Sequence, residues 1–190
     1  MEVQKLRDGL WRWTAPHPDL QPDDELGQDV GCVYYEAPET VVLIDPLVPA
    51  EAADHFWAAL DRDVERAGRP VTVLLTVEWH GRSADAVRAR YGAGSDVPRG
   101  VEAVRVAHFD EVIYWLPEHA AVVAGDVLLG AGSGEVRLCP DSWLAEGGDP
   151  EEFRASLRPL LDLPVELVLV SHGEPVLEQG HEALARALQT

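Results

Sequence analysis

The sequence predicts a single α/β domain. Short apolar segments typical of buried strands alternate with segments whose apolar residues recur at helical spacing. Some of the strands are joined by tight turns, so we expect helices covering mixed sheets and not a regular βαβ repeat. The chain has 190 residues, enough to bury one sizeable core, and no linker-like or low-complexity segment divides it. We therefore expect one domain over residues 1–190.

Each element is predicted from its apolar pattern and from the residues that bound it. The strands are short and apolar, and Pro-Glu turns follow two of them. Strands are predicted at 32–37, 40–46, 70–77, 100–107, 111–117, 120–130 and 165–171. Helices are predicted at 50–68, at 83–91 with Ser83 as cap, at 149–163 behind an Asp-Pro start, and from about residue 179. The stretch 14–29 is rich in Pro and Asp and is predicted to be a loop.

Composition limits the classes of partner. The formal net charge is −19, from 34 acidic and 15 basic residues. Such a surface repels phosphate groups, so we expect neither nucleic acid nor an anionic membrane as partner. Our further expectation of a small-molecule substrate or ligand does not follow from the charge. Cys32 and Cys139 lack metal-ligand spacing and are expected to be buried structural thiols. No signal-peptide pattern and no apolar run of about 18 residues is found, which predicts a cytoplasmic protein.

Polar residues that can carry chemistry follow four of the apolar strands. Asp45 ends "VVLIDP", Glu78 and His80 end "VTVLLTVEWH", Asp126 follows "AAVVAG", and His172 follows "VELVLVS". Catalytic and binding residues gather where strands end and loops begin. An isolated buried carboxylate is costly, so each buried Asp must be paired or must bind a cation.

These segments, in this order, resemble the metallo-β-lactamase-fold hydrolases, which include glyoxalase II-like thioesterases. The segment "LWRWTAP…VVLIDP" is similar to the opening strands of that family, and "YWLPEHAAVVAGDVLLG" and "LVLVSHGEPV" are similar to two of its later motifs. The resemblance covers almost the whole chain. It implies a four-layer αββα sandwich, with Asp126 and His172 at the positions of metal ligands.

The stretch "LLTVEWHGRS" departs from that family. The family has an HxHxDH cluster after the Thr that corresponds to Thr76. The four ligand positions are occupied here by Val77, Trp79, Gly81 and Arg82, which offer no lone pair for zinc. His80 falls between these positions. A further family His corresponds to His108, which lies 18 residues before Asp126 and lacks the flanking glycines.

We therefore predict a metallo-β-lactamase-fold protein with a reduced or lost metal site. Catalytic zinc needs about three protein ligands and an open position. The candidates are His80, His108, Asp126 and His172, with His80, Asp126 and His172 as catalytic residues and with zinc or another divalent metal. The implied activity is hydrolysis of an ester, thioester or lactone.

The alternative is a metal-free, non-catalytic member that binds a small ligand or a protein partner through the same cleft. His80 then shapes the start of a helix, or with Arg82 binds an anion, and Glu78 and His17 are further candidates for ligand binding. In that case Asp126 is held by backbone amides of its loop, His172 stabilises its turn, and His108 is an ordinary His beside a strand. The residues alone leave both hypotheses open.

Overall fold

The computed structural model describes residues 1–107 and 109–189. Within it the chain forms two compact units. Unit 1 comprises Met1–Leu75 and Trp79–Val101, and unit 2 comprises Thr76–Glu78 and Glu102–Thr190. The expectation of one domain remains a prediction.

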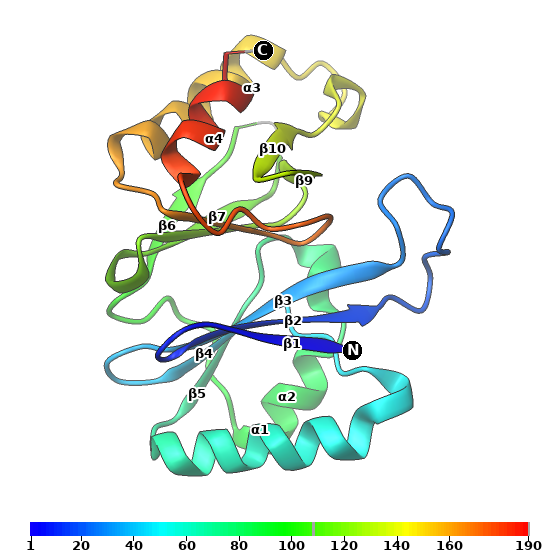
Figure 1. The fold of residues 1–190 in the computed structure, drawn as a ribbon, viewed down its shortest axis with the longest axis vertical. Coiled ribbons are helices and arrows are strands. Elements are labelled where there is room, and N and C mark those ends of the chain that lie inside the picture. The colour runs from blue at the N-terminus through cyan, green and yellow to red at the C-terminus, as the bar shows by residue number, and fades with distance from the viewer. Residues whose placement is uncertain (108, 190) are drawn as a thin grey trace. The chain divides into compact units, whose positions relative to one another are not determined.

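Unit 1 is a five-stranded sheet with helices on one of its faces (Figure 1). The strand order is β1-β2-β3-β4-β5, and only β4 and β5 are parallel. The strands are β1 (Glu2–Arg7), β2 (Leu10–Pro16), β3 (Asp29–Glu36), β4 (Val41–Ile44) and β5 (Val71–Leu74). The helices are α1 (Ala53–Ala67) and α2 (Ala84–Tyr91). Phe56 and Leu60 of α1 and Val87 of α2 share one buried cluster with the sheet, so both helices cover the same face.

Unit 2 contains a four-stranded sheet of order β11-β8-β7-β6 and a separate β9-β10 hairpin. Only the β8–β11 pair is parallel in the larger sheet. The strands are β6 (Glu102–Arg105), β7 (Val112–Leu116), β8 (Ala121–Ala124), β9 (Leu128–Gly132), β10 (Glu135–Leu138) and β11 (Leu167–Val170). The helices are α3 (Pro150–Leu157) and α4 (Gly180–Ala187), and Phe153 and Leu184 bury them in one cluster with the sheet.

Most predicted elements are confirmed, with shorter bounds. The 32–37 and 40–46 strands pair as a hairpin, and the 50–68 helix ends where Gly68 adopts a left-handed conformation. Asp149 caps α3 by accepting the Glu151 N–H. The 14–29 loop was predicted too long, because its first three residues belong to β2 and Asp29 opens β3.

Three other predictions were wrong or incomplete. The segment 120–130 is not one strand but β8 and β9, which lie in different sheets. Ser83 precedes α2 but makes no side-chain cap, because its hydroxyl accepts the Val48 N–H at 3.0 Å. The strands β1 and β10 were not predicted, and β2 was expected only from the family resemblance.

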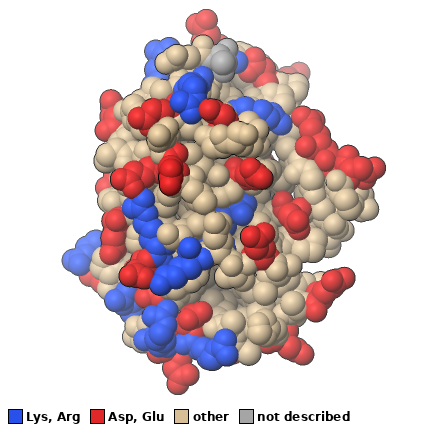
Figure 2. All heavy atoms as spheres, in the orientation of Figure 1, with Lys and Arg blue, Asp and Glu red and all other residues tan. Residues whose placement is uncertain are grey.

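The surface agrees with the composition. Acidic side chains are spread over the face drawn in Figure 2, as the net charge of −19 requires. Cys32 and Cys139 are both free and buried, as predicted. No helix among the described residues combines the length and the apolar character needed to cross a membrane.

Candidate functional site

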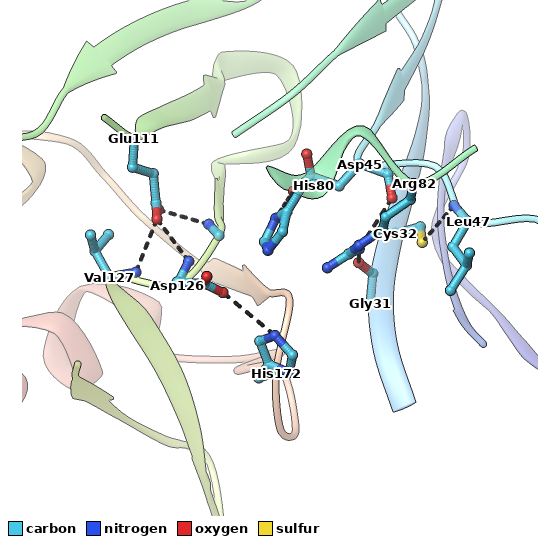
Figure 3. A network of polar contacts seen from close by, with 11 residues as sticks. Gly31, Cys32, Asp45, Leu47, His80, Arg82, Glu111, Asp126, Val127 and His172 are labelled. Atoms are coloured by element: carbon cyan, nitrogen blue, oxygen red, sulfur yellow. Dashed lines mark hydrogen bonds and ion pairs between the residues drawn. The ribbon is translucent and has the colours of Figure 1, made fainter. Parts of the chain in front are cut away.

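Asp126 and His172 lie side by side in unit 2. Asp126 follows β8 and His172 follows β11, and these two strands are parallel neighbours. Parallel strands end at the same edge of a sheet, so this topology brings together residues that are far apart in sequence. His172 Nε2 lies 3.5 Å from Asp126 Oδ1, and both side chains are buried (Figure 3). A carboxylate and an imidazole at this separation can share one cation.

Glu111 supports the segment that carries Asp126. Its carboxylate accepts the backbone N–H groups of Gly125 at 2.8 Å, Asp126 at 2.7 Å and Val127 at 3.0 Å (Figure 3). Glu111 is 1% exposed, and this burial raises the pKa of its carboxyl to about 8 against the lowering effect of the three N–H donors. Sequence reasoning missed this residue. The one sequence feature that could have pointed to Glu111 is that it is an acidic residue directly before the apolar segment "VIYWL".

The turn that carries His172 rests against β9 through two glycines. The Gly130 N–H donates to the His172 carbonyl at 2.9 Å. A Cβ added to Gly173 would lie 2.6 Å from the Gly130 oxygen, and one added to Gly130 would lie 2.5 Å from the Glu174 nitrogen. Gly173 also has a φ of +83°, which favours glycine. The two backbones can approach this closely only because neither residue has a side chain.

In unit 1, Asp45 orients His80. Asp45 directly follows β4 and has a φ of 50°, in the left-handed region that Asp tolerates. Its N–H donates to the Leu74 carbonyl at 3.1 Å. His80 Nδ1 lies 3.0 Å from Asp45 Oδ2, and both side chains are 4% exposed (Figure 3). Metal-ligating histidines are commonly held by a carboxylate in this way. With Nδ1 bound to Asp45, His80 would use Nε2 as a ligand.

Arg82 adds positive charge to the part of unit 1 that also holds His17. Arg82 has a φ of 34°, and its guanidinium donates to the carbonyls of Gly31 at 3.4 Å and Asp45 at 3.3 Å (Figure 3). Burial and the nearby Arg82 lower the pKa of half-buried His17, and His80 contributes in the same direction. His17 Nδ1 accepts the Asp19 N–H at 3.2 Å. The result is a local group of basic side chains in a strongly acidic protein.

Two further residues were predicted for the site. Glu78 is exposed, and its role in ligand binding stays a prediction. His108 lies outside the described residues. The structure pairs His80 with Asp45 in unit 1 and Asp126 with His172 in unit 2. Asp45 was recognised as a strand-end residue, but its partner could not be read from the sequence.

Comparison with known family models and with curated protein sequences finds no match. Solved structures do match over nearly the whole chain. A metallo-β-lactamase from Erythrobacter litoralis shares 15% identity, covering 98% of this chain and 90% of that chain at a TM-score of 0.60. One from Pontibacter korlensis shares 16% identity, covering 100% and 99% at a TM-score of 0.55. A metallo-β-lactamase family protein from Thermus thermophilus shares 19% identity, covering 97% and 80% at a TM-score of 0.54.

The chain therefore has the metallo-β-lactamase fold. Its mixed α/β architecture, with several sheets and helices packed on them, confirms the predicted fold class. At these identities the likeness concerns the fold and does not carry over an activity.

Proposed function

We propose that the protein is a hydrolase of the metallo-β-lactamase fold with one divalent metal ion. Asp126 and His172 would hold the metal, with His80 or His108 as the third ligand. The substrate would be a carbonyl compound of the ester, thioester or lactone class. The observation that carries the proposal is the contact between the buried side chains of Asp126 and His172. The cytoplasm stays our prediction for the protein's location.

The donor set fits a single metal ion. One carboxylate with two imidazoles is a common ligand set for catalytic zinc and for non-haem iron. The pairing of His80 with Asp45 supports His80 as the third donor, because such a carboxylate fixes the ring. A second metal is not expected, since Val77, Trp79, Gly81 and Arg82 cannot replace the lost ligands.

Each residue then has a separate task. A divalent metal at this site would supply Lewis-acid chemistry and an activated water. Asp126 and His172 would bind and orient the ion, while Asp45 holds the His80 ring through Nδ1. The buried carboxylate of Asp126 gives unit 2 negative charge that favours a cation.

Elemental analysis of untagged protein purified without chelator tests the proposal. We expect about one equivalent of zinc, iron or manganese per chain, lost in Asp126→Ala and in His172→Ala because each removes one of about three ligands. The control is Asp141→Ala, which removes an exposed acid. Loss in His80→Ala or in His108→Ala identifies the third ligand. Protein that holds no metal even after incubation with excess of each ion would rule the proposal out.

A second candidate is a metal-free protein that binds a small anion in unit 1. The charge of Arg82 favours it, because burial and this charge together lower the pKa of His17, which is the effect of a positive field in this part of unit 1. A bound carboxylate would neutralise the charge of Arg82 and accept charge-assisted hydrogen bonds from its guanidinium.

Titration calorimetry with malonate at low salt tests this candidate. We expect Arg82→Gln to weaken binding roughly 10-fold or more, as loss of a hydrogen bond to a charged group requires. Arg88→Gln is the matched control, since Arg88 pairs with Asp85 on the exposed side of α2. Unchanged malonate affinity in Arg82→Gln, or no binding by the wild type, would exclude an anion site at Arg82.

A further inference from the structure

Glu111 is fixed at the start of β7 by its own backbone. Its N–H donates to the Phe109 carbonyl at 2.6 Å, and its carbonyl accepts the Val106 N–H at 3.1 Å. The next residue, Val112, donates to the Thr76 carbonyl at 2.7 Å. The backbone on both sides of the Glu111 side chain is therefore fixed by hydrogen bonds. This gives the Glu111 carboxylate a defined position in unit 2.

The carboxylate meets three consecutive N–H groups where β8 ends. Oε1 accepts from Gly125, and Oε2 accepts from both Asp126 and Val127. Successive N–H groups that point the same way form a site for a negative charge. Here the occupant is a side chain of the same unit, which satisfies three donors that would otherwise be buried without acceptors. These three hydrogen bonds hold the backbone at 125–127, and so they explain why the segment 120–130 divides there into β8 and β9.

Gly125 allows this approach. A Cβ at that position would lie 2.5 Å from Thr76 Oγ1 and 3.0 Å from Glu111 Oε2. Any side chain would therefore push the Glu111 carboxylate away from the backbone that it binds. Glu111, Gly125 and Thr76 together determine the course of the chain on both sides of Asp126.

We propose that Glu111 is a positioning residue for Asp126. By binding the 125–127 backbone it directs the Asp126 carboxylate towards His172. It touches neither the ion nor the substrate, and it acts on them only through Asp126. The part of the proposal that concerns metal rests on the proposed function, whereas the part that concerns the 125–127 backbone does not.

Glu111→Gln tests the backbone part, by amide hydrogen exchange. Gln keeps the length of the side chain but has one oxygen in place of two, so at least one of the three N–H groups loses its acceptor. We expect exchange at Gly125, Asp126 or Val127 to be roughly 10-fold faster or more, with β11 amides unchanged. Glu102→Gln, in exposed β6, is the control. Wild-type exchange rates at all three amides would overturn the proposal.

Zinc affinity in the same variants tests the positioning role. We expect the Kd for zinc to rise about 10- to 100-fold in Glu111→Gln, the usual cost of losing support for a metal ligand. Glu111→Asp serves if the Gln variant fails to fold, because it keeps the carboxyl group but is too short to reach all three donors. Faster exchange with an unchanged Kd would overturn the positioning role. A wild type without zinc would instead overturn the proposed function, while the exchange rates would still decide the backbone part.

Discussion

Replacing Gly130 by alanine is expected to destabilise the protein by about 3 kcal/mol, at the upper end of the cost of overpacking. The added Cβ would lie 2.5 Å from the Glu174 nitrogen and 2.8 Å from the Gly173 carbonyl carbon. Both atoms belong to the backbone, so no side chain can rotate to make room. The turn after β11 must move, and the hydrogen bond from the Gly130 N–H to the His172 carbonyl must lengthen or break.

Thermal unfolding measures this effect. For a chain of this length, about 3 kcal/mol corresponds to a decrease in Tm of roughly 6–12 °C. Gly94→Ala is the matched control, because a Cβ there meets nothing within 4 Å. We also expect Gly130→Ala to lose metal, since the movement carries His172 away from Asp126. Equal Tm values for the two variants would show that the contact between Gly130 and the 173–174 backbone is not tight.

The fold could be predicted largely because its signals are local. The helix that ends at Gly68 and the Asp149 cap follow from residues within a few positions of one another. The short strands show as apolar runs because their side chains are buried. The prediction of one strand over 120–130 was wrong because apolar residues lie on both sides of Gly125 and Asp126, and the bonds at the break come from a carboxylate 14 to 16 residues earlier in the chain.

The candidate site could be predicted only in part. Asp126 and His172 were found because both follow apolar strands, and the parallel pairing of β8 and β11 brings them together. Glu111 was missed, because an acidic residue before an apolar segment does not by itself show which strand its side chain turns towards. The Gly130–Gly173 approach was also missed. A glycine in the sequence does not reveal which backbone lies against it.

The departures from the HxHxDH pattern have a structural counterpart. Arg82, which stands at a ligand position of that pattern, donates to the carbonyls of Gly31 and Asp45. A guanidinium is permanently charged, so it can supply a positive charge in unit 1 without any metal. The Asp45 carboxylate is hydrogen-bonded to His80.

Replacing Asp45 by alanine is expected to cost about 3 kcal/mol of stability, because it breaks a buried polar pair by removing one member. His80 Nδ1 would lose the carboxylate 3.0 Å away, and alanine would have to adopt a φ of 50°. Asp45→Asn is the matched control. Asn tolerates the left-handed conformation and its oxygen can still accept from Nδ1, so we expect a loss of only about 1 kcal/mol.

A double-mutant cycle with His80→Ala separates the pair from the backbone effect. If Asp45 acts through His80, the two substitutions will be non-additive, with a coupling of about 1 kcal/mol or more in urea unfolding. The strain at Asp45 is independent of His80 and cancels from the cycle. Additive losses would mean that Asp45 serves β4 and the backbone after it and does not orient the His80 ring. In that case His80 would lack the support expected of a metal ligand, and His108 would become the stronger candidate for the third position.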